Sequence, residues 1–180
     1  MRSKRIVAVV VAALAAIGIL SAALWSEIYT GGTPSMASFA LIHFAGYLFF
    51  LLMPVEALVP VYQSEGHATE FLLVISVATA LAAQAIDYGI GRAMSDPVMH
   101  GLIGERRYAK FRTSIERWGG WAIFLFNVFP LSSPNMLLVA GIMRYSPMKS
   151  FLYSFVGLAA KYSVIIYVFD AASGWMSQMP

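Results

Sequence analysis

Residues 53–60 read MPVEALVP, and this short stretch decides how the chain around it can fold. It lies inside a long apolar block, residues 36–62, and it places Glu56 between Pro54 and Pro60. Proline lacks a backbone N–H and breaks a helix. A charged side chain in hydrocarbon costs about 2.5–3.5 kcal/mol or more, unless it is paired, hydrated or neutralised. The sequence therefore predicts that this block is broken and that Glu56 meets a partner or water.

The composition of the chain indicates a membrane protein. Of its 180 residues, 59% are hydrophobic and 12% are charged, against about 25% charged residues in a typical soluble domain. About 20 apolar residues are needed to cross a bilayer as a helix. We therefore expect one multi-pass domain, residues 1–180, in the cell membrane. The sequence has no cysteine, which excludes a disulfide framework and a thiolate metal site.

Five long apolar blocks follow one another along the chain. Three contain no proline, namely residues 6–25, 71–91 and 151–169. The other two are interrupted, residues 36–62 by Pro54 and Pro60, and residues 121–143 by Pro130 and Pro134. The first block is longer than the roughly 7–15 residues of a signal-peptide core. This length favours an uncleaved first helix over a signal peptide.

A polar linker, residues 92–118, separates the first three blocks from the last two. From Glu105 onward its apolar residues recur at three- and four-residue spacing, namely Tyr108, Phe111, Ile115 and Trp118. This spacing predicts an amphipathic helix. Two interpretations stay open: the helix lies on the membrane surface, or it is an ordinary solvated connection.

The charges predict how the blocks cross the membrane. Positive residues favour the cytoplasmic side, so Arg2, Lys4 and Arg5 place the N-terminus in the cytoplasm. If residues 36–62 crossed fully, the basic linker would lie outside. If this block instead enters and returns on the outer side, the linker is cytoplasmic.

The same argument makes residues 121–143 a second re-entrant hairpin, because Arg144 and Lys149 then stay inside. Non-helical backbone at membrane depth must be buried in protein or face water, so the two hairpins should meet inside the molecule. The expected fold is an all-α integral membrane protein with three transmembrane helices and two opposed, proline-broken re-entrant hairpins.

A weak internal repeat agrees with this fold. Glu56 precedes Asp87 by 31 residues (87 − 56), and Pro130 precedes Lys161 by the same number (161 − 130). In each unit a broken segment is followed by an unbroken span that bears a charge and a tyrosine. Inverted repeats with broken helices are typical of transporters.

Three charged residues lie at membrane depth. Glu56 and Asp87 are candidates for proton or ion coupling, although Asp87 could instead pair with Arg92 at the interface. Lys161 lies in the middle of its span, too far from either end to reach water easily. It therefore needs an anion, which we expect to be Glu56, Asp87 or the phosphate of a ligand. A purely structural ion pair is the alternative.

Other polar residues are candidates for binding the head group of a ligand. Asn127 and Ser133 flank Pro130, where they either satisfy freed backbone groups or contact the ligand. Arg144 is either an interfacial anchor or a lipid-binding group. His43 lies on an apolar helix, where a hydrogen-bonded core histidine is the default. No nucleophile elbow, HExxH motif, P-loop or metal-ligand spacing appears, so we expect no enzyme, metal or cofactor.

Over residues 51–170 the sequence resembles the DedA / VTT-domain family, also called the SNARE-associated Golgi protein family. The motifs that carry the resemblance are P-V-E at Pro54–Glu56, D-Y-G-I-G-R at Asp87–Arg92, W-G-G at Trp118–Gly120, Pro130 ten residues before Ala140-Gly141, and Gly157 before Lys161-Tyr162. Each motif is weak alone, but their order and spacing make the match fairly specific.

The resemblance implies two opposed re-entrant hairpins and a flippase or scramblase of lipids. It also implies that acids couple translocation to protons and that arginines engage phosphate. This chain departs from the family pattern, because Gln84 stands where many members have an aspartate, and Asn127 and Ser133 stand where members have arginines. Lys161 and Arg144 are the nearby cations left to engage a phosphate.

The leading hypothesis is a DedA-like transporter of a lipid or lipid phosphate between leaflets, with proton-coupling acids Glu56 and Asp87. The predicted head-group residues are Lys161, Arg144, Asn127 and Ser133. An ion-coupled transporter of a small solute and a non-transporting scaffold are the alternatives. The expected partners are membrane lipids and not nucleic acid, and homo-oligomerisation stays open.

Overall fold

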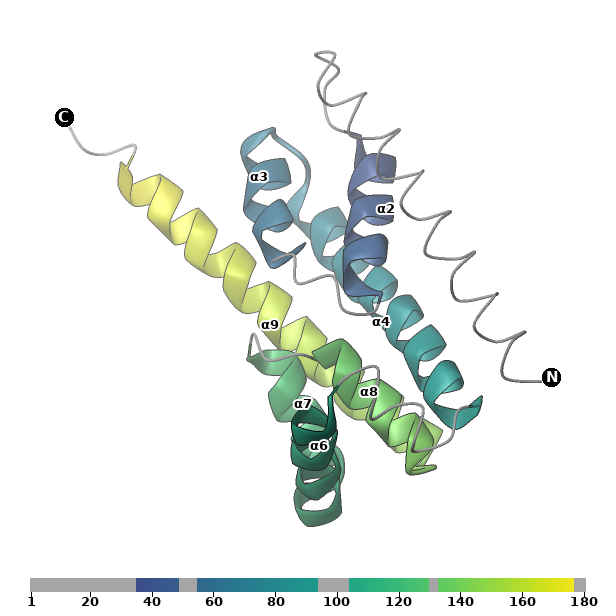
Figure 1. Ribbon diagram of the computed structural model, residues 1–180. Coiled ribbons are helices and arrows are strands. Elements are labelled where there is room, and N and C mark those ends of the chain that lie inside the picture. The colour runs from purple at the N-terminus through teal and green to yellow at the C-terminus, as the bar shows by residue number, and fades with distance from the viewer. Residues whose placement is uncertain (1–34, 49–54, 94–103, 130–132, 177–180) are drawn as a thin grey trace.

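The computed structural model describes residues 35–48, 55–93, 104–129 and 133–176 (Figure 1). These residues are all helical and contain no strand. The elements are α2 (Met36–Tyr47), the 3-10 turn η1 (Val55–Ala57), α3 (Leu58–Ser64), α4 (Thr69–Ala93), α6 (Glu105–Trp118), α7 (Gly120–Val128), α8 (Ser133–Ile142) and α9 (Pro147–Met176). The expected first helix, residues 6–25, lies outside the described residues, as do Pro54 and Pro130.

Two long helices, α4 and α9, form the frame of the molecule. They contain 25 and 30 residues, which at 1.5 Å per residue gives lengths of about 38 and 45 Å. A bilayer's hydrocarbon core is about 30 Å thick, so both helices are long and apolar enough to cross it. The described fold is therefore compatible with an all-α membrane protein. Both helices contain the unbroken spans expected at residues 71–91 and 151–169.

The first proline-containing block forms an antiparallel pair of short helices, α2 and α3. A capping box between Ser35 and Ser38 begins α2. The Ser38 hydroxyl lies 3.0 Å from the Tyr62 hydroxyl near the end of α3, and Gly46 near the end of α2 packs against Val55 at the start of η1. Pro60 is the third residue of α3, in the first turn, where a missing N–H removes no intrahelical bond. The described helices are therefore interrupted before Pro60, between α2 and η1.

The second proline-containing block gives another antiparallel pair, α7 and α8. Gly119, which precedes α7, lies beside the Tyr145 hydroxyl just beyond the end of α8. Pro134 is the second residue of α8, again in a first turn. The two pairs lie toward opposite ends of the α4–α9 frame (Figure 1).

Glycines bring the helix backbones of this second pair close to the frame. A Cβ added at Gly91 of α4 would overlap the Leu138 carbonyl of α8, and one at Gly141 of α8 would overlap the Tyr88 carbonyl of α4. On the other side, a Cβ at Gly157 of α9 would press on Asn127 of α7. Helices approach this closely only where one residue has no side chain. Thus α8 packs on α4, and α7 packs on α9.

The first pair divides its contacts in a matching way. In this pair α2 packs mainly on α4, and α3 contacts both α4 and α9. In each pair, therefore, the first short helix packs on the long helix that follows it in sequence. The second short helix contacts the other long helix.

The amphipathic helix α6 forms where the apolar spacing predicted it. Its residues Tyr108, Phe111 and Ile115 are buried in a core cluster with residues of α7 and α8, whereas Trp118 is 56% exposed. Protein covers most of the apolar stripe. Neither sequence interpretation, a helix on the membrane surface or a solvated connection, expected this.

Large apolar side chains lie on the outside of the long helices. The exposed ones on α4 and α9, and on the shorter α7 with Phe129 just after it, are Phe71, Val74, Ile86, Trp121, Leu125, Phe129, Met148, Leu152, Phe155, Val156, Val164, Tyr167, Val168 and Trp175. The buried polar residues within the described ranges are Ser38, His43, Ser76, Gln84, Asp87, Asn127, Asn135, Ser150, Ser154 and Lys161. The outer faces of these helices are therefore apolar, while the interior combines two apolar clusters with these polar groups.

Candidate functional site

A buried ion pair occupies the centre of the molecule. The Lys161 ammonium donates a hydrogen bond of 2.9 Å to Oε1 of Glu56 and one of 2.8 Å to the Tyr47 hydroxyl. The Lys161 side chain is 5% exposed and the Glu56 side chain is 28% exposed. Of the three anions considered for Lys161, the structure brings Glu56 to it.

The fold positions this pair by bringing both sides of the first interruption to the middle of α9. Tyr47 is the last residue of α2, Glu56 lies in η1, and Lys161 is the fifteenth of the 30 residues of α9. The ammonium also lies 5.3 Å from the ring centre of Tyr47 and 5.5 Å from that of Tyr162. Aromatic faces attract a cation at such distances, so both rings favour an ammonium group at this position.

His43 links this pair to α4. Its Nε2 lies 2.6 Å from the Tyr162 hydroxyl of α9, and its Nδ1 lies 2.8 Å from the Thr79 hydroxyl of α4. The imidazole ring is fully buried and stacks on Tyr47 at 5.5 Å. A hydrogen-bonded core histidine is the default expected from the sequence, but the sequence does not indicate the contact of His43 with Tyr162, the residue next to Lys161.

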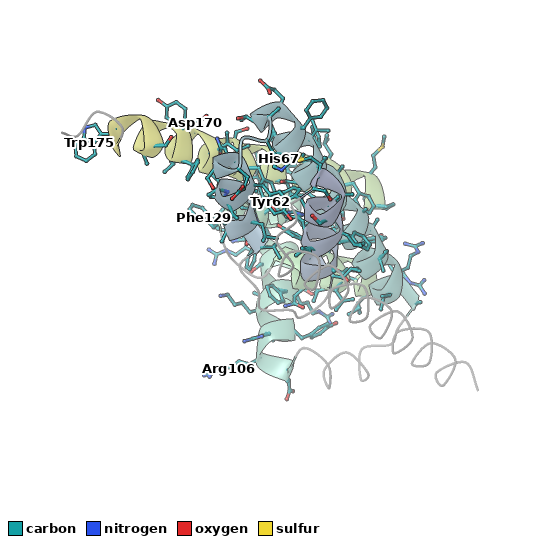
Figure 2. All side chains as sticks on the ribbon, turned by 90° about the horizontal axis from the view of Figure 1, so that it is seen from above. Tyr62, His67, Arg106, Phe129, Asp170 and Trp175 are labelled. Atoms are coloured by element: carbon teal, nitrogen blue, oxygen red, sulfur yellow. The ribbon has the colours of Figure 1, made fainter. Side chains whose placement is uncertain are left out.

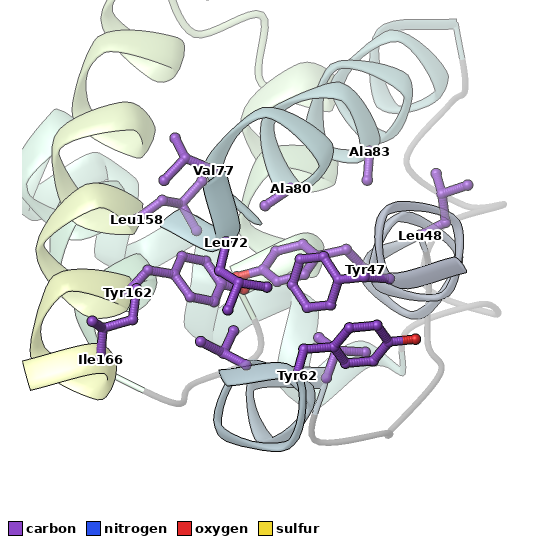
Figure 3. Packing of buried hydrophobic residues seen from close by; sticks show 13 residues of the cluster. Tyr47, Leu48, Tyr62, Leu72, Val77, Ala80, Ala83, Leu158, Tyr162 and Ile166 are labelled. Atoms are coloured by element: carbon purple, nitrogen blue, oxygen red, sulfur yellow. The ribbon is translucent and has the colours of Figure 1, made fainter. Parts of the chain in front are cut away.

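Apolar side chains surround these polar groups. Figure 3 shows Tyr47 of α2 and Tyr162 of α9 reaching toward one another, with Leu72 of α4 and Leu158 of α9 packed nearby. This packing limits the access of water and lowers the local dielectric constant, which strengthens each electrostatic interaction inside. The cluster of Tyr47, Glu56, Lys161, Tyr162 and His43 is called the central cluster below.

A second polar group is built from neutral side chains. Nε2 of Gln84 donates to Oδ1 of Asn127 at 2.6 Å. The Asn127 amide donates to the Ile123 carbonyl at 2.9 Å and to the Ser154 hydroxyl at 3.2 Å. Gln84 and Asn127 are fully buried. This amide cluster joins α4, α7 and α9, and it lies at the C-terminal end of α7, before the second interruption.

The two clusters lie close to each other along the frame. Ser154 and Lys161 are seven residues apart on α9, which is two turns, or about 10 Å. On α4, Thr79 and Gln84 are five residues apart, or about 8 Å. The first and second pairs of short helices therefore bring their ends near the middle of the frame, from opposite directions.

Asp87 is buried on α4 but lies away from Lys161. It is 1% exposed and eight residues beyond Thr79, about 12 Å along the helix. Its neighbour Tyr88 donates a hydrogen bond of 2.6 Å to the Tyr145 carbonyl, and the exposed Arg92 approaches the Tyr88 hydroxyl at 3.5 Å. The structure thus places the second candidate acid with the α8 end of the molecule.

The other predicted head-group residues do not join the central cluster. Arg144 is exposed just beyond α8, with φ of 53°, and it precedes the start of α9 by three residues. Lys161 lies 14 residues into α9, about 21 Å from its start. Ser133 begins α8. Asn127 belongs to the amide cluster.

The exposed charges divide between the two ends of the frame. One end carries Arg92, Arg106, Arg107, Lys110, Arg112, Arg117, Arg144 and Lys149, with the acids Glu105 and Glu116. The other end carries Glu65, Glu70 and Asp170. Figure 2 shows Arg106 on one side of the molecule, with Asp170 and His67 away from it. The described part of the chain is therefore strongly basic at one end only.

Within the described residues, no group of three His, Cys, Asp or Glu side chains is placed to hold a metal ion. A scan against family models found no match, and searches of curated proteins and of solved structures found none either. Fold and site together define a class: an all-helical protein with two helices able to span a membrane, an apolar exterior and a buried ion pair at its centre.

Proposed function

We propose that this protein is a membrane transporter of the DedA type, and that it moves a lipid with a phosphate-bearing head group between leaflets. In this proposal α4 and α9 cross the membrane. The α2–α3 and α7–α8 pairs are re-entrant hairpins that enter from opposite sides. The central cluster binds the head group in the middle of the bilayer.

The distribution of polar and apolar residues supports a membrane location. Exposed side chains such as Phe71, Leu152 and Val164 would cost free energy in water, whereas lipid tails solvate them well. The single-sided basic charge supports one orientation, because basic residues favour the cytoplasmic side. The end with α6 and Arg144 is therefore cytoplasmic, and the end with Glu65 and Asp170 faces outward.

The packing of the short helices supports two opposed hairpins. Neither α2, with 12 residues, nor α8, with 10, is long enough to cross hydrocarbon about 30 Å thick. Each pair is antiparallel, so each returns toward the side from which it entered. Their inner ends carry the polar residues Tyr47 and Asn127 and meet the frame near its middle, as at the midplane sites of transporters with inverted repeats.

The single observation that carries the proposal is the ion pair at the middle of α9. An ammonium has three N–H donors, and among the described residues Lys161 uses two of them, toward Glu56 and Tyr47. In this proposal the third donor binds the anion of the ligand. The side chain of Glu56 is 28% exposed, so in this proposal a head group approaches the pair from the side of Glu56.

A phosphate fits this site better than a neutral head group, because a buried cation gains most from a charged acceptor. Lys161 replaces the missing family arginines in this role. Asn127 keeps a different role, since both protons of its amide already have acceptors within the molecule. Arg144, at the cytoplasmic end, would meet lipid phosphates at the surface before or after crossing.

Flipping of fluorescent lipids in proteoliposomes tests this proposal. The test variant is Lys161→Met, and the matched control is Lys149→Met, which removes an exposed lysine from the first turn of the same helix. We expect the full-length protein to flip a phosphate-bearing lipid, Lys161→Met to lose at least about 90% of this activity, and the control to keep most of it. A 90% loss corresponds to about 1.4 kcal/mol. Equal activity of all three proteins would refute the role of Lys161.

A further inference from the structure

We propose that His43 takes up one proton whenever an anionic phosphate head group binds at Lys161, so that anion and proton enter the central cluster together. This inference rests on the proposed function and deepens it. It makes His43, and not Glu56, the residue that carries the proton. The argument follows from hydrogen-bond donors and from the charges around the imidazole.

The hydrogen bonds around His43 determine which ring nitrogen is open to a proton. The Thr79 hydroxyl donates to the carbonyl of Ile75, one turn earlier on α4, at 2.6 Å. A helical threonine commonly bonds back in this way. Its oxygen can then only accept from His43, so Nδ1 carries a hydrogen. In the neutral ring, Nε2 therefore accepts from the Tyr162 hydroxyl and is the one position that a proton can take.

Without a ligand, the charges around His43 sum to zero when its ring is neutral. Among the described residues, the ionisable groups that face it are Tyr47 from its own helix, Lys161 and Tyr162 from α9, and Glu56 from η1; from α4 it meets the neutral Thr79. Glu56 and Lys161 cancel each other. A proton alone would leave the cluster with a net positive charge, and an anion alone with a net negative one.

Uncompensated charge is strongly unfavourable in a largely buried site. A phosphodiester carries one negative charge, and one proton on His43 restores a net charge of zero. Protonation of Glu56 would balance the anion as well, but it would remove the counterion of a lysine that is only 5% exposed. His43 can accept the proton while the Glu56–Lys161 pair stays intact.

Tyr162 gives the proton a route and gives the anion a donor. The tyrosine hydroxyl passes its hydrogen to Nε2 of His43 and takes up another proton, which enters from the solution together with the anion, so that Tyr162 is neutral before and after and Lys161 keeps its charge. Protonated Nε2 then donates to the tyrosine oxygen, and the tyrosine hydrogen must point away from His43. In Figure 3 the Tyr162 side chain extends toward Tyr47, on the side where Lys161 binds. The proton on His43 thus creates a new hydrogen-bond donor facing the site.

Calorimetry with a soluble probe tests this coupling. The full chain in detergent is titrated with diethyl phosphate, whose single charge stays constant near neutral pH, in two buffers with different heats of protonation. The difference in apparent enthalpy gives the number of protons taken up. We expect about one proton per bound probe for the wild type, none for His43→Gln, and an unchanged value for the control His67→Gln, which alters a histidine in the loop before α4.

Each outcome decides between the two proposals. Uptake of one proton by His43→Gln would overturn the role of His43, and binding by the wild type without any uptake would overturn the coupling while leaving the proposed function in place. Absence of binding would overturn both. If His43→Gln does not fold, the ¹⁵N signals of His43 in the wild type replace it. They should show one bare nitrogen without the probe and two protonated nitrogens at saturation, and no change would contradict the inference.

Discussion

Replacing Glu56 with Gln should destabilise the protein more than replacing both Glu56 and its partner Lys161. The single change leaves the ammonium of Lys161 buried, at 5% exposure, with only neutral acceptors. Breaking a buried pair from one side typically costs about 3–5 kcal/mol. Because Glu56 is 28% exposed and some water reaches the pair, we expect the lower end, about 3 kcal/mol, for Glu56→Gln.

The opposite single change should cost less. Lys161→Met keeps the aliphatic stem and leaves a carboxylate that can turn toward water, so the loss is about 1 kcal/mol, the net value of an ordinary hydrogen bond. The double variant removes both charges and fills the space with neutral side chains. Such replacements are often nearly neutral, and we expect a loss of about 1 kcal/mol or less. The coupling between the two positions is then about 3 kcal/mol.

Reversible unfolding in mixed detergent micelles, followed by tryptophan fluorescence, measures these free energies. A cycle with Glu65→Gln in place of Glu56→Gln is the control, because Glu65 is exposed at the end of α3 and should show no coupling to Lys161. Additive losses for Glu56 and Lys161 would refute the buried ion pair. Lipid flipping by the double variant at the wild-type rate would show that the pair only holds the fold and takes no part in transport.

Three further changes test the packing and the membrane location. Gly91→Ala should cost more than about 2 kcal/mol in the same unfolding assay, because its Cβ would overlap backbone of α8. The control Gly89→Ala, at a position with open space, should stabilise the protein by up to about 1 kcal/mol. Equal effects of the two changes would contradict the close helix crossing. Asn127→Leu should cost about 1–3 kcal/mol, since it leaves the buried amide of Gln84 without its acceptor; an unchanged unfolding free energy would show that the amide cluster is not formed. In a variant that keeps only Trp121, which is 59% exposed on α7, brominated lipids should quench fluorescence strongly, and quenching by an aqueous reagent instead would argue against a lipid-facing helix.

The sequence predicts the contact between Lys161 and Glu56, because few groups in the chain can pair with a lysine at this depth. A cation in the middle of an apolar span needs an anion, and Glu56 is one of two acids at comparable depth. The same simple rule gives the positions of α4 and α9, since an unbroken apolar run of about 20 residues has one stable form in a bilayer. These predictions depend on composition and length alone.

The sequence does not predict contacts that depend on how a helix is rotated about its axis. Helix α2 is apolar on nearly all sides, so its hydrophobic pattern does not tell which way His43 points. The contact between Gln84 and Asn127, which are 43 residues apart, depends on the closeness that Gly157 allows between α7 and α9. A glycine in an apolar helix, such as Gly157, is a weak signal of close helix packing that could have indicated the amide cluster.

The apolar stripe of α6 and the position of Pro60 show two further limits of the sequence pattern, because both depend on how the helices pack. The stripe of α6 reveals which face is covered but not by what, and here α7 and α8 cover Tyr108, Phe111 and Ile115. Pro60 suggested a break in its block, yet it lies in the first turn of α3, where proline is favoured. A proline therefore marks a helix boundary without showing on which side the helix lies.

The most direct test of the head-group site is the distance between the Lys161 nitrogen and a lipid phosphorus atom. Replacing Lys4, Lys110 and Lys149 with Arg keeps every charge and leaves Lys161 as the only lysine in the chain. Solid-state NMR on this variant in phospholipid bilayers measures the dipolar coupling between ¹⁵N of the ammonium and ³¹P. Binding predicts a distance of about 4 Å, set by an N–H···O bond to a phosphate oxygen. The absence of any such coupling under transport conditions would contradict the account.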